Sequence, residues 1–211
     1  MHATQSIYTS YRGFIRGKTR ITLAWIFVLI LGIFSRNTQD LFYPSWPLWV
    51  GLGVAFLGAS LRFWASGFLR KDSRPAVGGP YAYVRNPLYL GTYLMGMGFI
   101  AIIQNYWLLV LSSVFFAAIY HYIILDEEIK LDALFGEPYL IYKKLVPRFF
   151  PRLWPTSQEA LSKVNSENSH RKFSTELAHK NKAYEAYVSF VGLWVWMFLA
   201  AQVWENFLKN F

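Results

Sequence analysis

The sequence predicts an all-α integral membrane protein with about five transmembrane helices. Of its 211 residues, 55% are hydrophobic and 19% are aromatic, a composition that disfavours a water-soluble fold. Charged residues make up only 16%, below the roughly 25% of soluble domains. They lie between long apolar runs, and runs of about 20 apolar residues cross a bilayer as helices.

The first apolar run, residues 21–35, is short for a span unless residues 19–37 extend it. A secretory signal peptide is the competing interpretation, but Phe34-Ser35-Arg36 is not a small-residue cleavage site. The second run covers residues 46–69 and is interrupted only by Arg62. We therefore expect both runs to span the membrane.

Small residues recur every four positions along the second run, at Gly51, Ala55 and Ala59. Such a stripe predicts close packing against another helix. Arg62, which lies near the end of the same run, has two interpretations. It either extends to the cytoplasmic interface, or contacts a lipid headgroup or the ligand.

The third and fourth runs, residues 87–103 and 106–125, are joined only by Gln104-Asn105 and therefore predict an antiparallel helical hairpin. A fifth run, residues 183–204, contains three tryptophans. Tryptophan favours the membrane interface, so this segment is predicted either to span the membrane or to lie in the interface.

The chain divides into a membrane core at residues 1–155, a polar linker or surface helix at 156–182, and a final transmembrane or interfacial helix at 183–211. Basic residues precede the first run and follow the second, whereas Arg36 alone lies between them. The positive-inside rule then places the amino terminus in the cytoplasm and the carboxyl terminus outside.

The net charge of +9 comes from cations that flank apolar runs, which suits contact with anionic lipid, and we expect no nucleic-acid partner. The chain has no cysteine, which excludes disulfides and cysteine-ligated metal. His170 and His179 lack a third ligand at metal-binding spacing, so we expect no metal.

A ligand site is predicted where the third run begins. Asn86-Pro87 is a strong helix start, in which the asparagine side chain accepts from free amides and proline occupies the first helical position. The amino end of that helix, with Arg85 beside it, suits a carboxylate or phosphate.

The fourth helix returns to the same membrane face and brings Asp126-Glu127-Glu128 close to Arg85. A zwitterionic ligand with a flat ring would fit between these charges. Four tyrosines would supply aromatic walls: Tyr81, Tyr83, Tyr89 and Tyr93. The alternative is that Arg85 only pairs with Glu127 or Glu128 and fastens the hairpin, while the tyrosines form an interfacial belt.

These motifs resemble a known family. Gly79-Pro80-Tyr81, residues 85–91 (RNPLYLG) and Glu127-Glu128 resemble the motif shared by isoprenylcysteine carboxyl methyltransferases and phospholipid methyltransferases. The continuation through residues 127–148 resembles the carboxyl-terminal block of the prenylcysteine enzymes, and the likeness covers roughly residues 58–155. Asn86 stands where that family usually has histidine.

The resemblance implies S-adenosyl-L-methionine as methyl donor, bound by motifs at residues 78–91 and 126–151 with a small cytosolic lobe at 126–155. The acceptor would be a lipid or a lipid-like carboxylate or amine arriving from the bilayer. The implied cofactor-binding residues are Gly79, Tyr81, Arg85, Asn86, Pro87, Tyr89, Glu127 and Glu128.

A carboxylate acceptor needs no base, whereas a protonated amine does, and the candidates for that base are Glu127, Glu128 and His121. Candidate contacts to substrate or headgroup are Arg62, Tyr93 and Arg148.

Two other functions remain open. Membrane sterol reductases, which use NADPH, resemble this family in their carboxyl-terminal half but carry a tryptophan where this chain has residues 135–139 (FGEPY). A non-catalytic membrane protein, in which Arg85 and the glutamates only hold the hairpin together, is the third interpretation.

Overall fold

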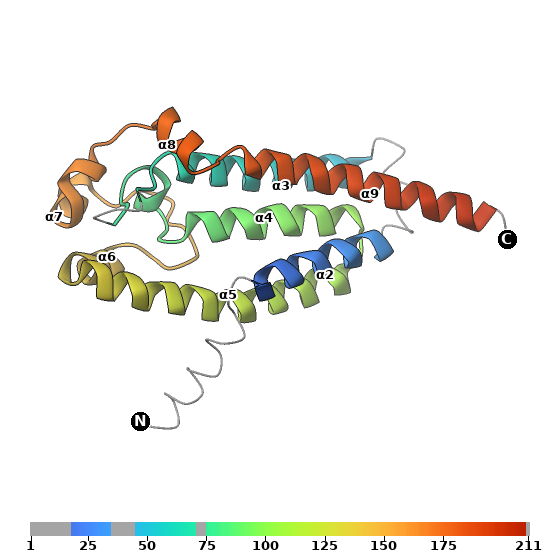
Figure 1. Ribbon diagram of the computed structural model, residues 1–211, viewed down its shortest axis with the longest axis horizontal. Helices are drawn as coiled ribbons and strands as arrows, with labels where there is room; N and C mark the ends of the chain where they lie inside the picture. The colour runs from blue at the N-terminus through green and yellow to red at the C-terminus, as the bar shows by residue number, and fades with distance from the viewer. Residues whose placement is uncertain (1–17, 35–44, 71–74, 210–211) are drawn as a thin grey trace, which may run out of the picture.

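The computed structural model describes residues 18–34, 45–70 and 75–209, which form helices and connecting turns without any strand. This confirms the predicted all-α class. The elements, labelled as in Figure 1, are α2 (Lys18–Phe34), α3 (Trp46–Ser66), the 3-10 turn η3 (Gly79–Ala82), α4 (Pro87–Ile102), α5 (Tyr106–Phe135), α6 (Glu137–Leu145), α7 (Gln158–Ser169), α8 (Thr175–Lys180) and α9 (Glu185–Lys209).

Three of these helices are long and apolar enough to cross a membrane, namely α3, α5 and residues 185–207 of α9. The chain is therefore an integral membrane protein. The sequence predicted about five spans, but α4 has 16 residues and α2 has 17. A 16-residue helix is about 24 Å long, less than the hydrocarbon thickness of about 30 Å. The predicted extension to Asn37, Arg36 itself and the basic residues before Lys18 lie outside the described residues.

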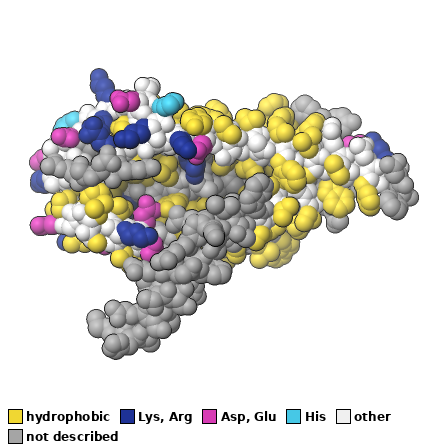
Figure 2. Space-filling model, in the orientation of Figure 1, with side chains coloured by type: hydrophobic (Ala, Val, Ile, Leu, Met, Phe, Trp, Pro, Cys, Tyr) yellow, Lys and Arg dark blue, Asp and Glu magenta, His cyan; other side chains and the backbone are white. Residues whose placement is uncertain are grey.

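Helix α4 lies in the middle of the bundle, with α3 and α9 on one side and α5 on the other (Figure 1). Helices α3 and α5 run opposite to α4 and α9, so the last turns of the first two meet the first turns of the others. Helices α6, α7 and α8 lie at the same end. Most charged side chains gather there, while the rest of the visible surface is largely hydrophobic (Figure 2). We call this end the polar end.

Glycines set the distance between α3 and α4. A Cβ atom added at Gly58 would lie 2.5 Å from the carbonyl oxygen of Gly91, and one at Gly91 would lie 2.6 Å from that of Gly58. Ala55 and Ala59 are fully buried in the same contact. The predicted small-residue stripe is thus confirmed, and it lets the two backbones approach closely. As a result α4 packs most extensively on α3, although α5 is its hairpin partner.

Helix α5 carries the acidic cluster to the polar end. Its first turn is capped by the side chain of Asn105, which accepts from the backbone N–H of Leu108 at 3.0 Å. It ends at Phe135, and the following Gly136 has a φ of 61°, which breaks the helix. Thirty residues make a helix of about 45 Å, longer than the hydrocarbon layer. Residues 126–128 lie in the half of α5 that ends at the polar end.

Residues 156–182 contain α7 and α8 and are tied to the bundle by asparagines. The amide of Asn165 donates to the carbonyl oxygen of Pro75 at 2.9 Å. Asn181 donates to the carbonyl oxygen of Ser66, the last residue of α3, at 2.9 Å. It also donates to that of Leu69, just beyond the helix, at 2.7 Å. These bonds fix the chain that leads from α3 to η3. The three-part division of the chain stays a prediction.

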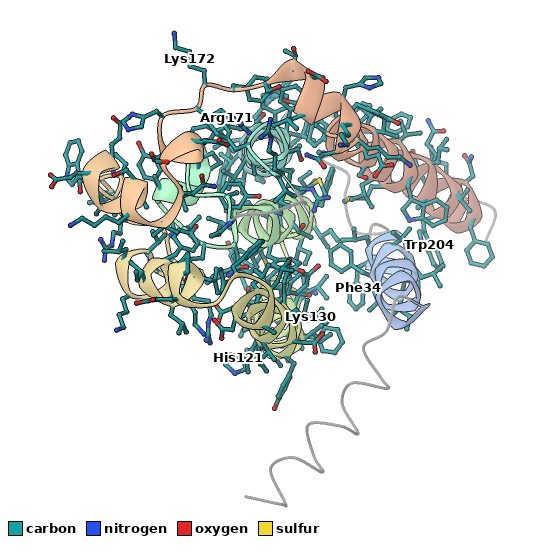
Figure 3. The ribbon with its side chains drawn as sticks, turned by 60° about the vertical axis from the view of Figure 1, so that its left-hand side comes forward. Phe34, His121, Lys130, Arg171, Lys172 and Trp204 are labelled. Carbon is teal, nitrogen blue, oxygen red and sulfur yellow. The ribbon has the colours of Figure 1, made fainter. Side chains whose placement is uncertain are left out.

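Helix α9 packs on α3 and α2. The indole nitrogen of Trp204 on α9 donates to the carbonyl oxygen of Gly32 on α2 at 3.3 Å. Figure 3 shows Trp204 beside Phe34, which is the last residue of α2.

Candidate functional site

Glu128 lies at the centre of the predicted site and joins two arginines. Its carboxylate is almost fully buried. Arg148 forms a bidentate pair with it, from Nε to Oε1 at 3.2 Å and from Nη2 to Oε2 at 2.8 Å. The Nη1 atom of Arg85 lies 3.3 Å from Oε1. One buried carboxylate therefore faces two guanidinium groups, which leaves an excess positive charge that another anion can balance.

The connection between α6 and α7 holds the Arg85 segment in place through its backbone. The N–H of Arg85 donates to the carbonyl oxygen of Pro147 at 2.9 Å, and the N–H of Arg152 donates to that of Tyr83 at 3.1 Å. Further along the same connection, the backbone N–H of Thr156 donates to the carbonyl oxygen of Ala82 at 2.9 Å. One signal of this contact is visible in the sequence, namely three prolines at positions 147, 151 and 155, which favour extended chain.

Asn86 does not cap α4, and this prediction was wrong. Its side-chain amide donates to the carbonyl oxygen of Arg148 at 3.0 Å, and no hydrogen bond joins its side-chain oxygen to the helix. The reason is the neighbouring connection, which offers an acceptor to the amide nitrogen. Pro87 does occupy the first turn, as predicted. The first turn of α4 is thus left uncapped by Asn86.

Glu127 faces α4 rather than the two arginines. The hydroxyl of Tyr89 donates to Glu127 Oε2 at 2.6 Å, a short distance typical of a charge-assisted bond. The Tyr89 ring also meets Tyr120 edge-on, with centroids 5.2 Å apart. Glu127 is half-buried, and a single hydrogen bond leaves it with further acceptor capacity.

Tyr93 lies one turn further along α4, among aromatic rings. Its centroid is 4.9 Å from that of Phe116 and 5.8 Å from that of Phe149. Its hydroxyl lies 3.3 Å from the hydroxyl of Ser113 on α5. An aromatic lining therefore runs between α4 and α5 toward Tyr89 and Glu127.

Buried donors without hydrogen-bond partners mark the interior of this region. They are the Nε atom of Arg85 and the hydroxyl of Tyr81, whereas Nη1 of Arg85 makes no hydrogen bond but pairs with Glu128. Burial raises the pKa of Tyr81, and the negative charge of Glu127 raises it further, so the hydroxyl keeps its proton. A buried donor without a partner costs free energy, typically about 1 to 3 kcal/mol, unless a ligand accepts its bond.

Gly79 and Tyr142 support Tyr81 from either side. Gly79 has a φ of 58°, and a Cβ atom there would lie 2.5 Å from the ring of Phe68. The hydroxyl of Tyr142 donates to the carbonyl oxygen of Tyr81 at 2.8 Å. Burial also raises the pKa of Tyr142. Sequence reasoning missed Tyr142, which lies 61 positions from its acceptor.

Two predicted site residues lie apart from this group. His121 is exposed on the outer side of α5, where Figure 3 shows it on the same helix as Lys130 and away from the bundle. Arg62 belongs to α3 and donates to the hydroxyl of Thr92 on α4. Among residues 18–34, 45–70 and 75–209, no group of three His, Asp or Glu side chains could hold a metal ion. The expectation of no metal stays a prediction.

Comparison with known families shows which group of proteins this arrangement resembles. Residues 47–138 match the phospholipid methyltransferase family. Over these residues, the chain is similar to that family. The match runs from α3 to the start of α6 and includes Arg85, Tyr89, Glu127 and Glu128. Arg148, α7, α8 and α9 lie beyond the part assigned to phospholipid methyltransferases.

Three curated relatives share part of the chain. The cobalt-zinc-cadmium resistance protein CzcN of Cupriavidus metallidurans is 32% identical over 133 residues, which is 60% of each chain. The nickel-cobalt-cadmium resistance protein NccN of Alcaligenes xylosoxydans xylosoxydans is 27% identical over 132 residues, 60% of this chain and 61% of the relative.

The third relative is the protein-S-isoprenylcysteine O-methyltransferase of Schizosaccharomyces pombe, 33% identical over 81 residues. That alignment covers 38% of this chain and 34% of the yeast protein. The chain thus spans about 60% of the length of the first two relatives and about a third of the yeast enzyme. No solved structure matches it.

Proposed function

We propose that this protein is a methyltransferase that uses S-adenosyl-L-methionine and acts on a lipid or a lipid-like carboxylate or amine at the cytoplasmic membrane face. One observation carries the proposal. The Arg85 side chain is only 9% exposed, its buried Nε atom has no hydrogen-bond partner, and it lies within the segment that matches the methyltransferase family.

The polar groups of the site fit the cofactor by their chemistry. The Nε donor of Arg85 and the first turn of α4, which Asn86 does not cap, suit its carboxylate. Glu127 has acceptor capacity for ribose hydroxyls, and Tyr81 adds a buried donor. When bound, S-adenosyl-L-methionine supplies an electrophilic methyl group on a positively charged sulfur.

The two glutamates take different roles in this proposal. Glu128 is a positioning residue, because both of its oxygens are engaged by Arg148 and one also faces Arg85. Glu127 is left to meet the ligand or to take the proton of an amine acceptor. His121 points away from both and is not assigned a role.

The acceptor would reach Glu127 along the aromatic lining formed by Tyr93, Phe116 and Phe149. These rings exclude water beside the reacting groups, and the helices align donor and acceptor for displacement at carbon. The basic residues of the sequence support a cytoplasmic position for the polar end, with the amino terminus inside and the carboxyl terminus outside.

Binding of S-adenosylhomocysteine to the purified protein in detergent, measured by calorimetry, tests the proposal. The wild type should bind, and Arg85→Ala should weaken binding by about 1.5 to 3 kcal/mol, the range for a hydrogen bond to a charged group. Arg70→Ala is the matched control, because Arg70 is exposed and its nearest acid, Glu167, lies 4.0 Å away. An affinity that Arg85→Ala leaves unchanged would remove Arg85 from the cofactor site.

The same measurement separates the alternatives. Binding of NADPH but not of S-adenosylhomocysteine would favour a sterol-type reductase, and binding of neither would favour a non-catalytic protein. Incubating lipid extracts with methyl-labelled cofactor would then identify the acceptor.

A further inference from the structure

A polar cavity lies on the α3 side of α4, whereas Glu127 approaches α4 from α5. Its volume is about 230 Å³, several times the roughly 30 Å³ that one water molecule occupies in the liquid. It is bounded by the last turns of α3, the first turn of α4 and the start of α9. The lining residues are Arg62, Ser66, Leu69, Leu88, Asn181, Lys182, Ala183, Glu185 and Ala186.

Arg62 is the half-buried cation of this cavity. One guanidinium nitrogen donates to Thr92, while the Nε atom is buried without a hydrogen-bond partner. Within the described part of the chain, no carboxylate lies within ion-pair distance of Arg62. A cation this close to the membrane interior is costly unless it meets a counter-charge.

The other charges of the cavity do not supply that counter-charge in full. Lys182 and Glu185 lie 3.8 Å apart and are both exposed at the rim. Together with Arg62 they leave one net positive charge. Ser66 and Asn181 already donate to backbone carbonyl oxygens, so they serve as walls rather than as free donors.

We propose that this cavity binds a phosphate group carrying one negative charge. Arg62, which lines the cavity, would donate to the phosphate, and Lys182 would approach from the rim. Leu69, Leu88 and Ala186 make the rest of the wall apolar, which suits a charged group attached to hydrocarbon. The phosphate comes either from the headgroup of an anionic lipid or from free phosphate, since both present the same oxygens. The site does not depend on the proposed methyl transfer.

Titration of the purified protein in detergent tests the proposal, with dihexanoyl phosphatidylglycerol in one arm and inorganic phosphate in the other. A dihexanoylglycerol of the same chain length, which lacks the phosphate, should not bind. Arg62→Ala should weaken the phosphate-bearing ligand about tenfold or more, as expected for a hydrogen bond to a charged group. Lys182→Gln should weaken it about two- to fivefold, because an exposed charge contributes less.

Glu185→Gln should change the affinity in the opposite direction and strengthen binding about two- to fivefold, because it removes the negative charge from the rim. This pair of exposed variants keeps the test valid even if Arg62→Ala fails to fold. Arg70→Ala is again the control, since Arg70 does not line the cavity.

Each outcome decides between the possibilities. Binding of phosphatidylglycerol alone supports a lipid site, and equal binding of inorganic phosphate supports a free-anion site. Failure of both to bind the wild type overturns the proposal, as does an equal affinity in Lys182→Gln, Glu185→Gln and wild type. S-adenosylhomocysteine affinity in Lys182→Gln and Glu185→Gln should stay at the wild-type value, so this test and that of the methyltransferase proposal fail independently.

Discussion

Arg85 and Arg62 are two cations at the polar end, the first with an almost fully buried side chain and the second half-buried, and the protein balances their charges differently. Arg85 meets Glu128, which is buried with it and is also held by Arg148. Within the described residues, the Arg62 side chain donates a hydrogen bond to the hydroxyl of Thr92 and forms no ion pair. Both sites therefore have excess positive charge, but the first contains its own buried carboxylate and the second does not. The difference indicates that the Arg85 site is built in the absence of ligand, whereas the Arg62 cavity gains its counter-charge on binding.

The largest effect should follow from removing the carboxylate that distinguishes the two regions. Glu128→Gln leaves two guanidinium groups without their shared anion, and breaking a buried pair in this way costs about 3 to 5 kcal/mol. We expect a large fall in the thermal unfolding midpoint of the purified protein in detergent. Arg148 is about a third exposed, so water offsets part of the loss and the lower end of the range applies.

Glu127→Gln is the matched control, because it makes the same chemical change at the adjacent residue. Glu127 accepts one hydrogen bond from Tyr89 and contacts no arginine in the described ion pairs. The thermal unfolding midpoint of the Glu127→Gln variant should therefore move little. Equal falls for the two variants would contradict the central role assigned to Glu128.

A smaller effect is expected on the Arg62 side from Gly91→Ala. The added methyl group would lie 2.6 Å from the carbonyl oxygen of Gly58 and 2.7 Å from Cγ of Arg62. The arginine side chain can move, but the backbone of α3 cannot, so we expect a loss of about 1 to 3 kcal/mol from overpacking. Thermal unfolding measures this loss.

Gly53→Ala is its control on the exposed face of α3, where a Cβ atom meets nothing within 4 Å. That change should stabilise the helix by about 0.5 to 1 kcal/mol, because alanine is the better helix former. A loss of stability in both variants would show that the effect of Gly91→Ala is not specific to the α3–α4 contact.

The two regions also differ in how far the sequence predicts them. The sequence predicts that Arg85 lies near the acidic cluster, because a short link joins the third and fourth apolar runs into a hairpin. The lengths of the two helices then determine which residues return to the same end. Gly51, Ala55 and Ala59 likewise predict a close helix contact by their spacing alone. These features depend on local periodicity, which a sequence displays directly.

Contacts between distant segments could not be predicted in this way. The amide of Asn86 donates to Arg148, 62 positions away, and so the cap predicted from local preference does not form. The cavity beside Arg62 needs α9 to return against α3, and no pattern in residues 183–204 identifies that partner. Where tertiary contacts compete with a local preference, the sequence shows only the preference.

The smallest effect should come from Tyr89→Phe, on the helix that separates the two regions. The change removes the 2.6 Å hydrogen bond to Glu127 but keeps the ring that meets Tyr120 edge-on. We expect a loss of about 1 kcal/mol in unfolding free energy, since water can reach the half-buried carboxylate and replace part of the bond. Tyr106→Phe, at an exposed tyrosine on the opposite end of α5, should lose nothing. A double-mutant cycle with Glu127→Gln isolates the pair, and additive losses would mean that Tyr89 does not hold Glu127 in the site.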